Sequence, residues 1–133
     1  MYMLDTNICI HVIKNRSAGL LDKIRAVINN DGVAISAITL SELKYGVYNS
    51  DYPGKNHIAL IQFLSIVSIL PYGDKAADEY GALRADLRRR GELIGANDML
   101  IAAHAKSLNM TLVTNNTKEF SRVADLSIED WTH

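Results

Sequence analysis

Cysteine, proline and long apolar runs are scarce in this sequence. Its 133 residues include one cysteine, Cys9, and two prolines, which excludes an intramolecular disulfide and a long proline-rich linker. No apolar run reaches the roughly 20 residues needed to cross a bilayer, and the first residues lack the pattern of a signal peptide. We therefore expect one cytoplasmic domain spanning residues 1–133, in which Cys9 is a buried, unreactive side chain.

An excess of basic charge is also missing. Lysine and arginine number 14 against 15 aspartates and glutamates, which gives a formal net charge of −1. Strongly basic nucleic-acid-binding proteins have a different profile, so contact with a nucleic acid would require a local basic patch. The candidates for such a patch are Lys14, Arg16, Arg84, Arg88, Arg89 and Arg90.

Several common catalytic signatures are absent as well. One cysteine and four scattered histidines provide no cluster with the spacing of a zinc site. The sequence has no phosphate-binding P-loop, no glycine-rich dinucleotide fingerprint and no G-x-S-x-G nucleophile motif. Acidic and amide side chains are therefore the main candidates for chemistry.

Strand and helix patterns alternate along the chain. Short apolar and β-branched runs predict strands at residues 2–4, 33–35, 66–70, 111–113 and 126–128. Apolar spacing typical of helices predicts helices at residues 7–14, 18–29, 38–49, 57–65, 74–90 and 98–108, with a loop at residues 51–54. This alternation predicts an α/β fold with a small, mostly parallel central sheet flanked by helices.

Asp5 directly follows the first predicted strand. Sites in parallel α/β sheets form beyond the carboxyl ends of the strands, and a carboxylate there must be paired, hydrogen-bonded or metal-bound to offset its burial. Thr6 and Asn7 come next, and both residue types cap helices. The alternative is therefore that Asp5 only forms part of a capping turn.

Two further acids lie on predicted helices. Glu42 is beside the apolar stripe of the helix at residues 38–49 rather than opposite it; the alternative is a boundary residue that pairs with a lysine. Asp98 has Ile101 and Ala102 at positions i+3 and i+4, which places it on the inward face of its helix. The alternative for Asp98 is an acid that stabilises the helix dipole, with Asn97 as the cap.

A polar pair, Asn115 and Asn116, follows the fourth predicted strand and Thr114. These residues belong to the same edge of the sheet, unless they form only a turn and a helix cap. Carboxylate and amide oxygens are hard ligands suited to Mg²⁺ or Mn²⁺. Because converging carboxylates repel one another, a divalent cation would stabilise such a set.

Four short motifs, in this order, resemble those of PIN domains. They are Met3-Leu4-Asp5-Thr6-Asn7, Ser36-(x)5-Glu42, Asp98-(x)2-Ile101-Ala102-Ala103-His104-Ala105 and Val113-Thr114-Asn115-Asn116-(x)3-Phe120. Within PIN domains, the sequence is most similar to the VapC toxins of bacterial type II toxin–antitoxin systems, as judged also by Tyr45-Gly46 and by Gly95 ahead of Asp98. The resemblance covers nearly the whole chain.

The resemblance implies a three-layer PIN-like fold and a metal-dependent endoribonuclease, a phosphodiester hydrolase, that forms a homodimer and is inhibited by a VapB-type antitoxin. It makes Asp5 and Asp98 the main Mg²⁺ ligands, with Mn²⁺ as a substitute, and Glu42 the third acid. Asn116 stands where many PIN domains have a fourth acid, so either its carbonyl or Glu119 would contribute there. Four neighbours are expected to position the ligands: Thr6, Asn7, Thr114 and Asn115.

The expected reaction is hydrolysis by metal-activated water, with Glu42 as a further ligand or as the proton acceptor. By resemblance the first substrate is tRNA, initiator tRNA above all; messenger RNA, ribosomal RNA and DNA stay open. One alternative is a non-catalytic PIN-like module that binds RNA or protein. Another is a phosphatase of the haloacid-dehalogenase type, although that chemistry needs an aspartate where this chain has Asn7.

Overall fold

Strands and helices alternate along the chain in the computed structural model, which describes residues 1–16 and 19–132. The strands of this described part are β1 (Tyr2–Leu4), β2 (Val33–Ser36), β3 (Ser68–Leu70), β4 (Thr111–Val113) and β5 (Ile128–Glu129). The helices are α1 (Thr6–Ile13), α2 (Leu20–Ile28), α3 (Ala37–Tyr48), α4 (Pro53–Leu64), α5 (Asp74–Arg89), α6 (Ala96–Ser107) and α7 (Thr117–Phe120). No described helix has the length and apolar character needed to span a membrane.

The sheet has the order β3-β2-β1-β4-β5, and all of its pairings are parallel. β1 lies in the centre, where Met3 is in register with Ala34 of β2 and with Leu112 of β4. The chain leaves β1 toward β2 on one side, whereas β4 joins on the other side. Such a reversal of strand order opens a crevice beyond the carboxyl ends of the strands, here next to Asp5.

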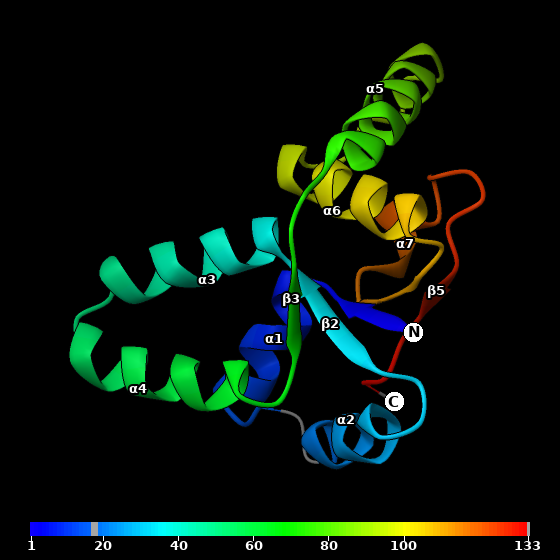
Figure 1. Ribbon diagram of the computed structural model, residues 1–133. Helices are drawn as coiled ribbons and strands as arrows, with labels where there is room; N and C mark the ends of the chain where they lie inside the picture. The colour runs from blue at the N-terminus through cyan, green and yellow to red at the C-terminus, as the bar shows by residue number, and fades with distance from the viewer. Residues whose placement is uncertain (17–18, 133) are drawn as a thin grey trace.

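Alternating side chains of the central strands supply two separate cores, one on each face of the sheet. Met3 packs in the core that α5, α6 and α7 cover. Its neighbour Leu4 packs in the core that α1, α2, α3 and α4 cover, together with Cys9. The result is a three-layer α/β fold (Figure 1), and both the fold prediction and the predicted burial of Cys9 are confirmed.

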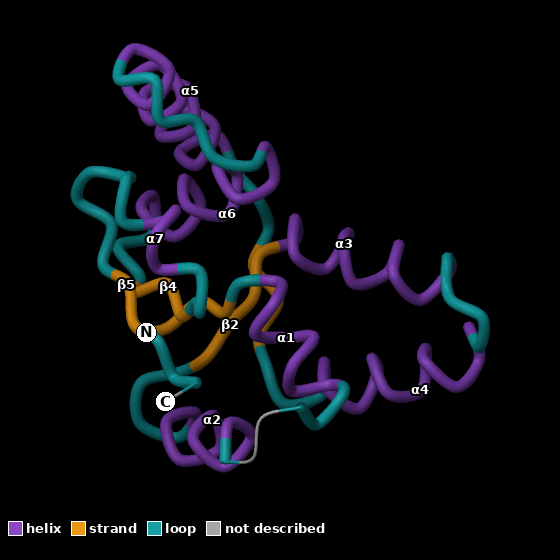
Figure 2. Tube along the Cα trace, turned by 180° about the vertical axis from the view of Figure 1, so that it is seen from behind, coloured by secondary structure: helices purple, strands orange, loops and turns teal. Residues whose placement is uncertain are grey.

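Helices α3 and α4 form an antiparallel arm that projects beyond the sheet and away from the α5–α6 pair, as the two opposite views show (Figures 1 and 2). Several large side chains on this arm and in the turn between its helices are exposed. Tyr45, Tyr48 and Tyr52 are 69%, 77% and 71% exposed, and Ile58 is also exposed.

The boundaries differ from the sequence prediction at a few places. α4 begins at Pro53 rather than at residue 57, because proline suits the first turn of a helix, where its missing N–H is not needed. β5 begins at Ile128, two residues later than predicted, after a turn in which Asp125 has a φ of 60°. The predicted start of the second helix at Ala18 lies outside the described residues.

A buried polar pair, Ser36 and His104, joins β2, α3 and α6. The Ser36 hydroxyl accepts a hydrogen bond from the Ile38 amide at 3.1 Å and so caps α3. The same oxygen lies 2.7 Å from Nδ1 of His104, whose ring packs edge-on against Tyr72. Burial lowers the pKa of His104, so the ring is neutral near neutral pH. This pair fixes the start of the helix that carries Glu42.

Replacing Ser36 tests this cap. Ser36→Ala removes the acceptor for Ile38 and leaves the buried Nδ1 of His104 without its partner. We expect the free energy of unfolding to fall by about 1–3 kcal/mol, measured by urea denaturation. Ser65→Ala, which removes an exposed hydroxyl at the end of α4, should change it by less than about 0.5 kcal/mol. Equal effects of the two variants would contradict the role of Ser36.

Candidate functional site

A cavity of about 600 Å³ opens beyond the carboxyl end of β1, between α1, α3 and α6. Three predicted acids, Asp5, Glu42 and Asp98, all line it. The full lining consists of Asp5, Thr6, Asn7, Ile10, Ser41, Glu42, Tyr45, Asn97 and Asp98. Residues from distant parts of the sequence thus form one acidic pocket, because three helices converge at this end of the sheet.

Asp5 is buried, with 3% of its surface exposed, and both of its oxygens are hydrogen-bonded. Oδ1 accepts from the Ile8 amide at 2.9 Å and so caps α1, whereas Oδ2 accepts from the Thr114 hydroxyl at 2.5 Å. The two interpretations of Asp5 are therefore compatible, since one carboxylate caps the helix and also lines the pocket. Each oxygen keeps a second lone pair for a ligand.

Glu42 is held by a contact between α1 and α3. Its Oε1 accepts a hydrogen bond from the Thr6 hydroxyl at 2.6 Å, so its partner is a threonine rather than the lysine of the alternative interpretation. The Thr6 hydroxyl also lies 3.2 Å from that of Thr39, which is buried. Since Thr6 directly follows Asp5, this bond ties the position of one acid to the other.

Asp98 lies in the first turn of α6, half-buried at the wall of the pocket. Ile101 and Ala102 on its face are fully buried, as the inward orientation predicts. The helix is capped by Gly95 rather than by Asn97, which instead lines the pocket. A Cβ atom on Gly95 would lie only 3.1 Å from Oδ2 of Asp98, so glycine leaves room for this carboxylate.

Asp5 and Asp98 hold their protons more strongly than ordinary aspartates do, because the pKa of each is raised. Burial, together with the nearby charges of Asp5, Glu42 and Glu119, raises the pKa of Asp98 to about 6. Burial also raises the pKa of Asp5, although the hydrogen bonds from Thr114 and Ile8 oppose the rise. Mutual repulsion of this kind is relieved when a cation binds between the groups.

The pocket offers oxygen ligands only, which suits a hard divalent cation such as Mg²⁺ or Mn²⁺. Within residues 1–16 and 19–132, no three acidic, histidine or cysteine side chains already stand close enough together to enclose an ion. Mg²⁺ does not need such a cage, because it keeps several waters and binds proteins through one or two carboxylates. The carboxylates of buried Asp5 and half-buried Asp98, which repel each other, therefore fit this kind of ion.

The predicted polar pair lies beside the pocket rather than in its wall. The Asn116 amide donates a hydrogen bond to Thr114 Oγ1 at 2.9 Å, so its main chain supports the threonine that holds Asp5. The residues that line the pocket do not include Asn115, Asn116 or Glu119. Asn115 is exposed, and Glu119 reaches the site through its charge, which acts on Asp98.

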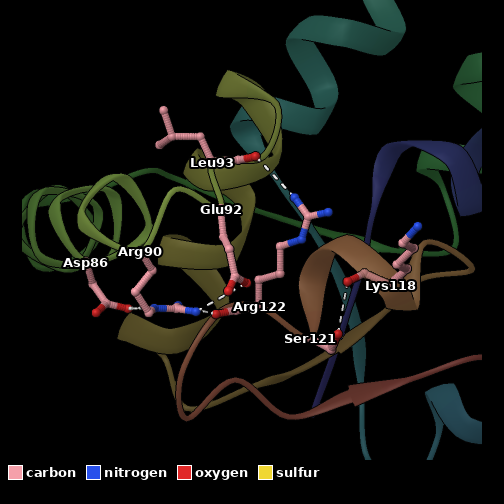
Figure 3. Close-up of polar contacts among 7 residues, drawn as sticks. All are labelled: Asp86, Arg90, Glu92, Leu93, Lys118, Ser121 and Arg122. Atoms are coloured by element: carbon pink, nitrogen blue, oxygen red, sulfur yellow. Dashed lines mark hydrogen bonds and ion pairs between the residues drawn. The ribbon is translucent and has the colours of Figure 1, made fainter.

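Arg90 from the predicted basic cluster has a structural role (Figure 3). It forms ion pairs with Asp86 and Glu92 and donates a hydrogen bond to the Arg122 carbonyl. The Arg122 guanidinium in turn donates to the Leu93 carbonyl at 3.2 Å. These contacts join the segment that leads into α6 and Asp98 to the segment after α7. None of the predicted basic candidates lines the acidic pocket.

The pocket also contains residues that the sequence did not single out as site residues. Ile10, Ser41 and Tyr45 line it together with the acids. Ser41 and Tyr45 flank Glu42 on α3, at one residue before it and three residues after it. Helical spacing from Glu42 could have identified Tyr45, since residues three apart share a helix face.

Known proteins that are similar to this chain indicate its family. Residues 2–126 match the PIN domain family. The chain is 44% identical to "Ribonuclease VapC2" of Rickettsia felis and 43% identical to "tRNA(fMet)-specific endonuclease VapC" of Shigella flexneri, with 98% of both chains covered in each case. The crystal structure of VapBC2 from Rickettsia felis bound to a promoter DNA fragment superposes with a TM-score of 0.95, at 43% identity and 98% coverage of both chains.

The raised pKa of Asp98 predicts how the stability of the metal-free protein depends on pH. Between pH 4 and about 6 the folded chain keeps a proton on Asp98 that the unfolded chain has lost, so this group lowers stability as pH rises. Asp98→Asn removes the effect. In thermal melts with a chelator, the difference in Tm between the variant and the unchanged protein should grow from pH 4.5 to pH 7.5. A Tm difference that does not change with pH would contradict the raised pKa of Asp98.

Gly95 provides a second test of the site geometry. A Cβ at this position would push the Asp98 carboxylate by a few tenths of an ångström, so Gly95→Ala should weaken Mg²⁺ binding several-fold, measured as a smaller rise in Tm with added Mg²⁺. Gly81→Ala, in the middle of α5 with open space around it, should leave Mg²⁺ binding unchanged and raise stability by up to about 1 kcal/mol. Unaltered Mg²⁺ binding by Gly95→Ala would disprove the need for space beside Asp98.

Proposed function

Because this chain belongs to the PIN domain family and, within it, to the VapC ribonucleases, we propose that its acidic pocket is the active site of a Mg²⁺-dependent endoribonuclease toxin. The observation that carries the proposal is the convergence of Asp5, Glu42 and Asp98 on one cavity at the switch point of the sheet. PIN-domain nucleases are metal-dependent enzymes, and the donor set of this pocket favours magnesium over softer metals.

The side chains of the pocket have distinct roles in this proposal. Asp5 and Asp98 would hold Mg²⁺, which when bound acidifies a water and stabilises charge on the scissile phosphate. Thr114 fixes Oδ2 of Asp5, and the Ile8 amide fixes Oδ1, so the carboxylate cannot rotate. Glu42, oriented by Thr6, either completes the ligand set through water or accepts the proton of the attacking water.

The names of relatives support a proposed substrate and a proposed partner. One relative is named a tRNA(fMet)-specific endonuclease, so we propose tRNA as the substrate, with initiator tRNA first. Neighbouring structures are VapBC complexes, so a VapB-type antitoxin is the proposed inhibitor. We also propose that the chain acts as one PIN domain over residues 1–133, as a homodimer, in the cytoplasm.

The two alternatives from the sequence are less well supported. A phosphatase of the haloacid-dehalogenase type is disfavoured by membership in the PIN domain family. A passive binding module would have no need to bury Asp5 or to raise the pKa of Asp98, because both cost stability. The acids therefore favour an enzyme over a module that only binds.

Variants of the acids test the reaction directly. Asn has nearly the shape of Asp but no charge, and at position 5 it keeps the oxygen that caps α1. Asp5→Asn and Asp98→Asn should therefore fold yet lose more than about 100-fold of the Mg²⁺-dependent cleavage rate, because each removes a charged metal ligand. Thr114→Val should lose about 10–100-fold, as is typical for residues that orient metal ligands. The assay is cleavage of total RNA and of purified initiator tRNA, with the new ends mapped.

The matched control is Asp78→Asn, an exposed carboxylate on α5, which should cleave like the unchanged protein. Full activity of either site variant would exclude the metal-holding role of that acid. Cleavage that continues in excess chelator would exclude metal dependence.

A further inference from the structure

Tyr45 combines a place in the acidic pocket with an exposed ring. It lies on α3, three residues after Glu42, and lines the same cavity as Asp5 and Asp98. Its side chain is 69% exposed, so the ring contributes little to the packing of the core. Among the described residues that line the pocket, it is the only aromatic one.

The same pocket has no positive side chain with which to hold RNA. Among the described residues that line it, none is lysine, arginine or histidine, and three are acids. Lys14 and Lys55 line an adjoining groove between α1, α3 and α4 instead. A phosphodiester is therefore repelled by the carboxylates around the reacting centre unless a cation binds there, and a contact with the uncharged part of the nucleotide would add binding energy that these acids do not oppose.

We propose that Tyr45 is a substrate-contact residue on whose ring an unpaired base next to the scissile phosphate stacks; this inference rests on the ribonuclease function proposed above. Every base has a flat π-face, and stacking on an aromatic side chain strengthens binding about 5- to 150-fold per base. Bases inside a duplex cannot stack in this way. The substrate class is thus RNA with a single-stranded loop at the cleavage site.

The chain offers close controls for this role. Tyr52 is exposed to a similar degree, 71%, and lies on the same arm, but it does not line the pocket. Phenylalanine at position 45 keeps the ring and removes only the hydroxyl. A role in stacking therefore predicts that Tyr45→Phe retains function and that Tyr45→Ala loses it, whereas Tyr52→Ala has no effect.

The first measurement is steady-state cleavage, with Mg²⁺, of a stem–loop RNA that the unchanged protein cleaves in its loop. Tyr45→Ala should raise KM about 5- to 150-fold while kcat changes less than about threefold. Tyr45→Phe and Tyr52→Ala should stay within about twofold of the unchanged protein. Thermal melts check that all three variants fold.

The second measurement is binding of the same RNA, carrying the fluorescent base 2-aminopurine in the loop, with Ca²⁺, another cation that binds oxygen ligands, in place of Mg²⁺. Stacking predicts that 2-aminopurine is quenched by the unchanged protein and by Tyr45→Phe, and that quenching is lost with Tyr45→Ala. This assay does not depend on cleavage. Absence of cleavage of any RNA by the unchanged protein would reject the proposed function, whereas cleavage with unchanged KM and unchanged quenching in Tyr45→Ala would reject the stacking role alone.

Three results would overturn the stacking role. One is an unchanged KM and unchanged quenching for Tyr45→Ala, as expected if this ring contacts only a protein partner. Another is an equal loss in Tyr52→Ala, which would indicate general damage to the arm. The third is no binding of the stem–loop RNA by the unchanged protein.

Discussion

The hydrogen bonds of the Asp5 carboxylate join the parts of the molecule that make the site. One oxygen caps α1, and the other accepts from Thr114 at the end of β4. A buried carboxylate is costly without such partners, so both contacts are needed to keep this charge at the end of the central strand. The next residue, Thr6, holds Glu42. Three elements that are far apart in the sequence, α1, α3 and β4, are therefore held together by one short turn after β1.

A second pair of residues, Ser36 and His104, holds the start of α3 in place. Ser36 caps the helix and contacts His104 of α6, the helix that also carries Asp98. The helix bearing Glu42 is thus fixed both to α1, through Thr6, and to α6, through a buried contact under the pocket. Residues other than the acids therefore set the spacing of the acids.

The strand-and-helix order, the parallel sheet and the three acids could be predicted from the sequence because each follows from local patterns. Asp98 was identifiable since its helix face is apolar, and Asp5 since it directly follows a buried strand. The proximity of Thr6 to Glu42 could not be predicted, because it depends on how α1 packs against α3. The start of α4 at Pro53 was missed because proline and glycine there are typical of a loop. Tyr45 belongs to the pair Tyr45-Gly46 that resembles VapC toxins. Its place in the pocket could not be predicted, because it depends on the direction in which the arm projects.

Among the described residues that line the pocket, none carries a positive charge, which under the proposed function would make the binding of metal and of RNA depend on each other. An anionic substrate enters an acidic cavity more easily once a cation has neutralised it, and by thermodynamic reciprocity the bound substrate then holds the cation more tightly. Under the proposed function, metal and RNA would therefore each raise the affinity of the pocket for the other. The free concentration of the divalent ion would then set how tightly the pocket binds RNA.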